Sequence, residues 1–263
     1  MPRYRITLKL NKNCPPNLNE HKLLMNGAHY NVAIGKDGIS LSLSPLDQAD
    51  REHAARTARQ VTNRFLNRLT AFTHYSTRIE PGYGYENIDN SSEKGDVVEA
   101  VGIASSRLHP ARLPKEVGLD QELTGAAFLR CGDLSDDPFD SFRNYYLAVD
   151  RIGKSVRGRR KPDSSVITDT IHIVQHKIVN DLADRLTTIR LPSSVRLSGK
   201  APEDLNNVLY GNLRCALMHS GGSNDFVPFD LDDEETVRSA LPIMRGLAWQ
   251  YVKHEREHLA GNP

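Results

Sequence analysis

The sequence predicts an α+β protein, in which a small N-terminal antiparallel sheet with a long helix is followed by a C-terminal all-α four-helix bundle. Apolar and polar residues alternate within positions 1–45, which is the spacing of half-buried strands. Apolar residues recur at every third or fourth position within 46–73 and again through the last ~130 residues, which is the spacing of amphipathic helices. We therefore expect two domains, residues 1–133 and residues 134–263.

The composition excludes several classes of protein. The 263 residues include 34 Lys and Arg against 33 Asp and Glu, so a net charge of +1 argues against a broadly basic coat for nucleic acid. No apolar run approaches the ~18 residues of a transmembrane span. Cys14, Cys131 and Cys215 are far apart and odd in number, so they indicate neither a zinc framework nor a complete disulfide framework. We expect a cytoplasmic protein without membrane attachment, resident metal or cofactor.

Four runs in the N-terminal half have the pattern of strands. Residues 4–10 alternate strictly, and residues 29–35 and 39–43 flank the dipeptide Asp37-Gly38, a strong hairpin signal because Gly accepts a positive φ. Residues 96–103 predict a further strand. These runs together indicate a small antiparallel sheet.

A single long helix is expected over residues 46–73. Its apolar stripe is Ala54, Ala58, Val61, Phe65, Leu69 and Phe72. Several arginines occupy the rest of its surface, and they either face solvent or meet phosphates. Residues 80–95, rich in Gly, Asn and Ser, predict a loop.

The first and last helices of the bundle have clear start signals. Asp137 has the position of an N-cap, and Pro138 that of the first helical residue. Asp232, with Glu235 three positions later, resembles a capping box at the start of the fourth helix. Pro242 lies inside that helix and predicts a kink.

The second and third helices are defined by their stripes. The second has one continuous apolar stripe, formed by Ile167, Ile171, Val174, Ile178, Leu182 and Leu186. The third begins near Pro202 and ends at Ser220-Gly221-Gly222, where the glycines predict a C-terminal stop. Its stripe consists of Leu205, Val208, Leu209, Leu213 and Ala216.

Two histidine pairs have the spacing of metal ligands on a helix. His254 and His258 belong to a His-Glu-x-x-His pattern, but a charged helix end with no downstream third ligand is unlike a zinc-protease site. His172 and His176 are also four apart, with Asp169 on the same predicted face. We interpret both pairs as solvated or partner-facing side chains.

The end of the third helix combines an arginine with a histidine. Arg214 and His219 are five positions apart, and a glycine break follows. At 100° per residue Arg214 projects opposite the apolar stripe, and the two side chains point about 140° apart. They would therefore converge across a two-fold dimer instead of on one helix. The alternative is structural, with Arg214 in an ion pair and His219 at a helix C-terminus.

An Arg-x4-His motif late in the third helix of a bundle resembles the HEPN superfamily. The order of domains is similar to a bacterial subgroup that includes Apea-like HEPN proteins and an accessory protein of methylamine utilisation. The resemblance implies a homodimeric, metal-independent ribonuclease, with Arg214 stabilising the phosphate and His219 in acid–base work. It also implies a sensing role for the N-terminal domain, in phage defence or a toxin system. Cys215 departs from the family, in which a polar residue usually follows the arginine. Asn212 either supplies a polar group at the site or makes an internal hydrogen bond.

A basic connection follows the first bundle helix and is a candidate RNA contact. A cluster of this kind tracks a phosphate backbone, whereas the alternative is a solvated loop. Its residues are Lys154, Arg157, Arg159, Arg160 and Lys161. The sequence thus supports two hypotheses, an RNA-cleaving homodimer and a catalytically silent module that binds a protein partner.

Overall fold

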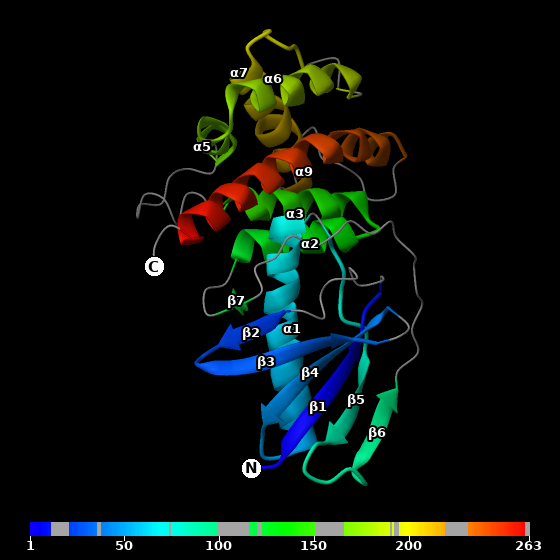
Figure 1. Ribbon diagram of the computed structural model, residues 1–263. Coiled ribbons are helices and arrows are strands. Elements are labelled where there is room, and N and C mark those ends of the chain that lie inside the picture. Colours follow the sequence, from blue (N-terminus) through cyan, green and yellow to red (C-terminus); the bar gives the residue numbers. More distant parts are fainter. Residues whose placement is uncertain are drawn as a thin grey trace. The chain divides into compact units, whose positions relative to one another are not determined.

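The computed structural model describes residues 1–11, 21–35, 38–73, 75–98, 116–119, 123–150, 166–189, 191, 195–218 and 231–260. It divides into two compact units, Met1–Leu123 and Thr124–Pro263. The first contains a sheet with a long helix and the second is helical, so the predicted α+β class is confirmed (Figure 1). The division lies ten residues before the expected one because the first helix of the second unit packs on that unit's other helices.

The sheet of the first unit has seven strands. Its order is β6-β5-β1-β4-β3-β2-β7, and all neighbours are antiparallel except β2 and β7. The strands are β1 (Arg3–Lys9), β2 (Lys22–Met25), β3 (Ala28–Ile34), β4 (Ser40–Asp47), β5 (Gly82–Asn87), β6 (Lys94–Val98) and β7 (Glu116–Gly118). The three strands expected first correspond to β1, β3 and β4. The expected strand over 96–103 overlaps β6, and its remainder lies outside the described residues.

The expected loop over residues 80–95 is wrong, because β5 and β6 form a hairpin there. The segment Gly-Tyr-Gly-Tyr has a weak strand pattern, because glycine is uncommon within strands. At position 84, however, a glycine is needed for a steric reason. A Cβ on Gly84 would lie 2.7 Å from a carboxylate oxygen of Asp96 on the paired strand. The side chain of Asp96 therefore occupies the space over this glycine.

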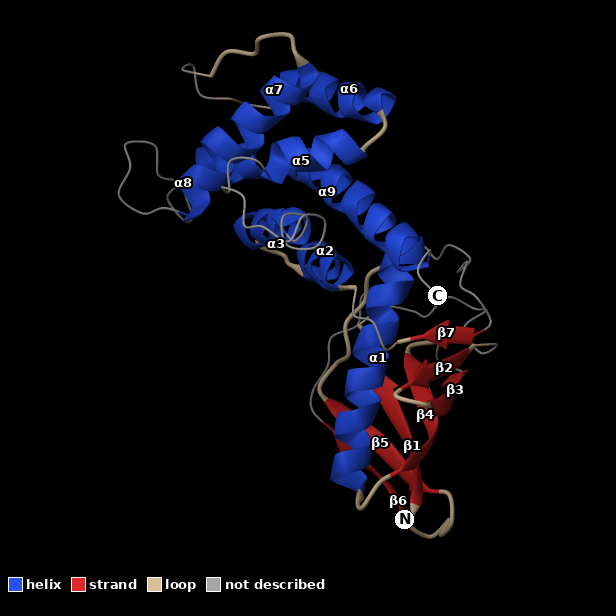
Figure 2. Ribbon diagram, turned by 90° about the vertical axis from the view of Figure 1, so that its left-hand side faces the viewer, coloured by secondary structure: helices blue, strands red, loops and turns tan. Residues whose placement is uncertain are grey.

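Helix α1 (Arg51–Thr73) lies across one face of the sheet (Figure 2). It begins five residues later than predicted, because Leu46 belongs to β4, which continues to Asp47. Asp50 accepts a hydrogen bond from the His53 N–H at 2.8 Å and caps the helix start. The predicted stripe is confirmed from Ala54 to Leu69, whereas Phe72 is half-buried and lies outside the core. The confirmed members pack with the inward face of the sheet in one core, which includes Ile6, Leu8, Leu41, Leu43, Ala58, Val61, Phe65 and Leu69.

Three arginines of α1 make contacts within the first unit. Arg51 donates to the Tyr85 hydroxyl at 2.9 Å, Arg59 to the Gly82 carbonyl at 2.8 Å, and Arg64 to the Leu119 carbonyl at 2.9 Å. These guanidinium groups satisfy groups of the neighbouring strand and loops. The described contacts thus connect the helix to β5 and to the residue that follows β7.

The second unit is built around one long helix. Helix α9 (Leu231–Ala260) packs against α2 (Thr124–Leu134), α3 (Pro138–Asp150) and α5 (Val166–Ile173). The remaining elements are α6 (His176–Asp184), the 3-10 helix η3 (Arg185–Thr188), α7 (Ala201–Asn206), the π-helix η4 (Asn207–Arg214) and α8 (Cys215–Met218). α9 continues through Pro242, whose ring faces solvent.

The second predicted helix is interrupted. α5 ends at Ile173, and α6 begins at His176 after Gln175 adopts an extended ψ of 136°. The run Ile171-His172-Ile173-Val174 contains three β-branched residues, whose χ1 restriction weakens a helix. His172 and His176 consequently lie on different helices.

Candidate functional site: Arg214 and its aromatic contacts

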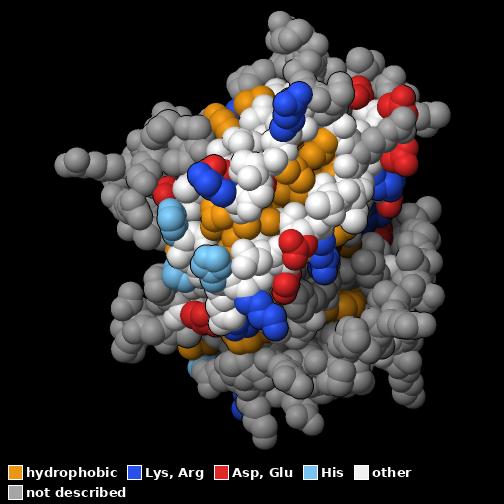
Figure 3. All heavy atoms as spheres, turned by 90° about the horizontal axis from the view of Figure 1, so that it is seen from above, with side chains coloured by type: hydrophobic (Ala, Val, Ile, Leu, Met, Phe, Trp, Pro, Cys, Tyr) orange, Lys and Arg blue, Asp and Glu red, His pale blue; other side chains and the backbone are white. Residues whose placement is uncertain are grey.

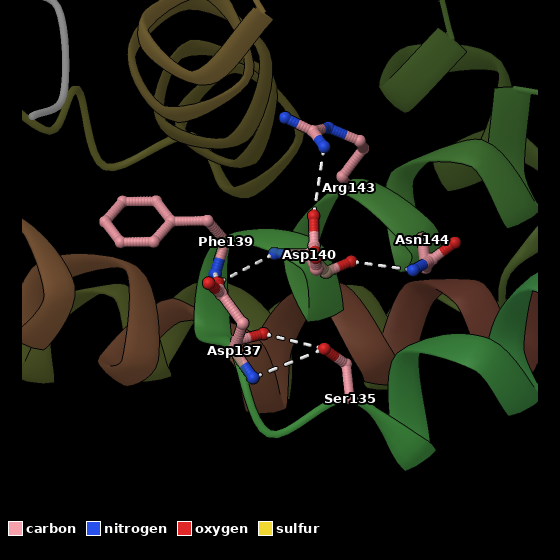
Figure 4. A network of polar contacts seen from close by, with 6 residues as sticks. All are labelled: Ser135, Asp137, Phe139, Asp140, Arg143 and Asn144. Atoms are coloured by element: carbon pink, nitrogen blue, oxygen red, sulfur yellow. Dashed lines mark hydrogen bonds and ion pairs between the residues drawn. The ribbon is translucent and has the colours of Figure 1, made fainter. Parts of the chain in front are cut away.

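The start of α3 is fixed as its sequence predicts. The Asp137 carboxylate accepts hydrogen bonds from the N–H groups of Phe139 at 2.7 Å and Asp140 at 3.1 Å (Figure 4). The Ser135 hydroxyl accepts a hydrogen bond from the Asp137 N–H at 3.3 Å and donates to the Asp137 carbonyl at 3.2 Å. Asp140 pairs with Arg143 at 3.0 Å. This network holds the helix that carries Tyr146.

A buried carboxylate fixes the start of α7. Asp204 accepts hydrogen bonds from the N–H and hydroxyl of Ser198, at 2.7 and 2.9 Å, and from the Gly199 N–H at 2.9 Å. Burial of the carboxyl opposes its ionisation, but these donors outweigh it and lower the pKa of Asp204. The segment leading into η4 is thereby anchored at its first turn.

η4 is a π-helix, in which a hydrogen bond spans five residues instead of four. The Cys215 N–H points to the Tyr210 carbonyl in this way. The Asn212 side chain adds a second bond over the same distance, donating to the Asn207 carbonyl at 2.6 Å. Asn212 therefore stabilises the wide turn.

The Arg214 guanidinium lies over two tyrosine rings. Its central carbon is 5.6 Å from the ring centre of Tyr146 on α3 and 5.5 Å from that of Tyr210 on η4. Tyr146 is only 2% exposed, while Arg214 and Tyr210 are half-buried. Both distances are within the range of cation–π attraction.

This direction of Arg214 differs from the one that an α-helical wheel predicts. The wheel places Arg214 opposite the apolar stripe, yet its guanidinium reaches a buried ring of α3. A π-helix has more residues per turn than an α-helix, so its side chains rotate by less than 100° per residue. The π-helical segment ends at Arg214, where the difference has accumulated.

Several residues of the predicted site lie outside the described residues. They are His219, Lys154, Arg157, Arg159 and Arg160. The structure brings Arg214 together with two tyrosines that the sequence did not single out. The four-residue spacing of Tyr210 and Arg214 was a signal for one of them, whereas Tyr146 is brought in by the packing of α3.

The histidine pairs have no metal-binding geometry in the part of the chain that the structure describes. Within it, no group of three or more His, Cys, Asp and Glu side chains is arranged to hold a metal ion. His172 and His176 are both exposed, and the side chain of His258 is outside the described set. Both histidine pairs thus remain without a described third ligand.

The surface above α6 and α7 has mixed charge (Figure 3). Histidines gather at one side of it, apolar side chains are visible near its middle, and basic and acidic side chains are interspersed. On the described part of this face no continuous basic patch follows the helices. None of the helices that the structure describes has the length and apolar character to cross a membrane.

Comparison with known proteins relates the helical unit to one family. Residues 126–253 match the family described as methylamine utilization protein MauJ, which covers slightly less than half of the chain. The expected similarity to a methylamine-utilisation protein is confirmed for this region. A 33 kDa chaperonin of Oceanobacillus iheyensis is 28% identical over 138 residues, 49% of this chain and 45% of that protein. The chain thus spans less than half the length of this curated relative. No solved structure matches the chain significantly.

Proposed function

We propose that the chain is a HEPN-type endoribonuclease that acts as a homodimer and cleaves RNA without a metal ion. One observation supports it best: Arg214 is held against two tyrosine rings at the end of η4, five residues before His219. A restrained guanidinium is suited to phosphate, because it is always charged and presents planar N–H donors.

The reaction requires proton transfer and charge stabilisation. A ribose 2′-oxygen attacks the adjacent phosphorus and forms a new P–O bond, while the bond to the 5′-oxygen of the next nucleotide breaks. His219 of one protomer accepts the 2′-hydroxyl proton, and the second His219 of the dimer donates a proton to the departing 5′-oxygen. Arg214 stabilises the charge on the non-bridging oxygens. The products are a 2′,3′-cyclic phosphate and a 5′-hydroxyl.

Substrate binding is assigned to the basic connection. Its cationic side chains neutralise backbone phosphates and make affinity salt-dependent. Its members are Lys154, Arg157, Arg159, Arg160 and Lys161. Asn212 serves the site indirectly, by its bond to the Asn207 carbonyl.

The test is RNA cleavage in EDTA by purified full-length protein. Labelled single-stranded RNA and transfer RNA are incubated with wild type, His219→Ala, Arg214→Ala and the control His176→Ala, which removes an exposed histidine of the same unit. We expect cleavage with cyclic phosphate ends by wild type and control, and a loss of at least ~100-fold in both site variants. Equal cleavage by all four proteins, or by none, would refute the proposal.

A second candidate function is a catalytically silent accessory module. The match of residues 126–253 to a family named for methylamine utilisation favours it, as does Cys215 beside the arginine. In this role Arg214 and its tyrosines support packing alone. Absence of cleavage together with a monomeric state in solution would favour the module over the nuclease.

A further inference from the structure

We propose that η4 is a register switch, which exchanges between the π-helical register of this structure and an α-helical register and thereby turns Arg214 toward or away from Tyr146. The switching segment is Asn207–Arg214, which lies between α7 and α8. The exchange is a property of the protein alone, so it is testable without RNA. Its effect on RNA cleavage rests on the proposed function.

The hydrogen bond that ends η4 is shared between a narrow and a wide turn. The Cys215 N–H points to two carbonyls, that of Asn212 three residues before it and that of Tyr210 five residues before it. An α-helical bond would go to the carbonyl of Gly211, four residues before, which lies between these two acceptors. The α-helical bond is therefore the intermediate arrangement, and α8 follows directly.

A side-chain bond at the surface holds the wide turn. The Asn212 amide donates to the Asn207 carbonyl, five residues earlier, at 2.6 Å, and this bond is exposed. In the α-helical register the same carbonyl would accept the Gly211 N–H. Gly211 is exposed, and among the described residues none lies within 4 Å of the position that its Cβ would take. Water competes for the Asn212 bond, and no described packing over Gly211 opposes a change of register.

The apolar residues of this segment fit both registers. The structure buries four of them to 1% exposure or less, namely Leu205, Val208, Leu209 and Leu213. At ~100° per residue the same four residues also lie within an arc of about 140° on an α-helix. On that α-helix Arg214 lies on the opposite side. A change of register therefore keeps the apolar face inside and changes the direction of Arg214.

The anchor of α7 decides which end of the helix turns. Asp204 accepts three hydrogen bonds from Ser198 and Gly199, so the start of the helix is fixed. A wide turn delays the residues after it by about one position, which is ~100° around the axis. Arg214 ends η4 and therefore takes the accumulated rotation. In the π-helical register its guanidinium carbon is 5.6 Å from the ring centre of Tyr146.

The two registers correspond to two states of the candidate site. The π-helical register holds Arg214 on the rings, which is the arrangement that the proposed function uses, and the α-helical register withdraws it. The flanking residues have helical dihedral angles, φ −64° and ψ −46° at Asn206 and φ −65° and ψ −41° at Cys215, so the exchange needs no unfolding. A ligand that favours one register would thus regulate the site.

The first test is NMR on the free full-length protein labelled with nitrogen-15 and carbon-13. Relaxation-dispersion and saturation-transfer experiments detect a minor state that exchanges on the μs–ms timescale. We expect such exchange for the amides of η4 and α8, and none for the anchored first turn of α7. Absence of exchange throughout η4 overturns the switch.

Two substitutions shift the balance toward the α-helical register. Asn212→Leu removes the bond to the Asn207 carbonyl, and Gly211→Ala introduces the strongest α-helix former. Each should raise the ratio of α- to π-helical register by about 2- to 10-fold, and the double variant should raise it further. Asn180→Leu is the matched control, because Asn180 is an exposed asparagine on α6.

The Nε–Hε signal of Arg214 reports the register, and its loss in Arg214→Lys identifies it. From wild type through the single variants to the double variant we expect it to move progressively away from its position beside the rings. The carbon-13 shifts of η4 should stay helical throughout, and Asn180→Leu should resemble wild type. An unmoved Arg214 signal in the double variant overturns the switch. Loss of the helical shifts does so too, because the Asn212 bond would then maintain the helix and not its register.

The last test connects the switch to the reaction, with RNA as substrate. We expect kcat to fall in proportion to the remaining π-helical fraction, in the order wild type, single variants and double variant, while Asn180→Leu keeps the wild-type kcat. A wild type that exchanges between registers but cleaves no RNA would support the switch and refute the nuclease. An active wild type, with variants whose kcat does not follow the Arg214 signal, would refute regulation of the site by the register.

Discussion

Arg245 of α9 and Asp133 of α2 form a two-point ion pair across the helical unit, 112 residues apart in the sequence. The guanidinium Nε is 2.6 Å from Oδ1 and Nη2 is 3.0 Å from Oδ2, and the Tyr145 hydroxyl of α3 donates to Oδ1 at 2.8 Å. The hydrogen bond to Asp133 raises the pKa of Arg245. Burial, with the adjacent carboxylate, raises the pKa of the Tyr145 phenol. One carboxylate thus links three helices.

Removing one partner of this pair should destabilise the unit. The Asp133 side chain is 7% exposed and that of Arg245 is 37% exposed. Arg245→Met leaves a buried carboxylate with only its remaining donors, and we expect a loss of ~2–4 kcal/mol, below the full cost of a deeply buried pair because the arginine is partly solvated. Urea unfolding measures the change. Asp133→Asn with Arg245→Met should recover part of the loss, whereas simple additivity of the two changes would contradict the coupling.

The N-cap of α3 should contribute about as much to the free energy of unfolding as other N-caps do. Asp137→Ala removes the acceptor of two backbone N–H groups, so we expect a loss of ~1 kcal/mol in the free energy of unfolding. Asp137→Ser should restore most of it. The neighbour Asp136, exposed and preceding the cap, is the matched control for loss of charge. Equal effects of Asp136→Ala and Asp137→Ala would mean that charge, not capping, matters.

The Asp204 carboxylate should make stability depend on pH in the acid range. Its pKa is lowered in the folded protein, so its contribution is present above the unfolded value of ~3.9 and is lost as pH falls through the folded value. Asp204→Asn should cost ~1–2 kcal/mol at pH 7, and the difference from wild type should shrink toward pH ~3. Denaturation with urea across this range is the measurement, and a constant difference argues against the proposed linkage.

Two glycines of the helical unit should differ in how well they tolerate alanine. A Cβ on Gly132 would overlap the Tyr145 ring, which is held in place by the hydrogen bond from its hydroxyl to Asp133. Gly132→Ala should therefore cost ~1–3 kcal/mol by overpacking. Gly211, on η4, has open space where its Cβ would be, so Gly211→Ala has no steric cost. Thermal unfolding of both variants compares them, and a stable Gly132→Ala protein would show that Tyr145 is free to move.

Local signals predicted the parts of the fold that depend on local physics. The Asp137 cap, the stripe of α1 and the hairpin of β3 with β4 follow from the spacing and chemistry of nearby residues. The β5–β6 hairpin was missed because its stability comes from pairing with β1, which overrides the weak strand pattern of its glycines. The interruption at Gln175 was missed because an apolar stripe continues across it.

The candidate site was predictable only in part. The Arg-x4-His spacing marks Arg214 in the sequence, and Tyr210 lies one helical turn before it. The contact with Tyr146 depends on how α3 packs, and the bridge from Asp133 to Arg245 spans 112 residues. Tertiary contacts of this kind have no signature in a single sequence.

The π-helical turn of η4 separates two quantities that sequence comparison treats as one. A motif counts positions along the chain, whereas a binding group depends on its angle around the helix axis. In a protein whose corresponding segment is an ordinary α-helix, the same Arg-x4-His letters would aim the arginine elsewhere. Conversely, a shorter α-helical segment can present an arginine in the direction of Arg214 with a different number of residues between the arginine and the histidine. Function should therefore be compared here by angular position, and equal spacing is no guarantee of an equal site.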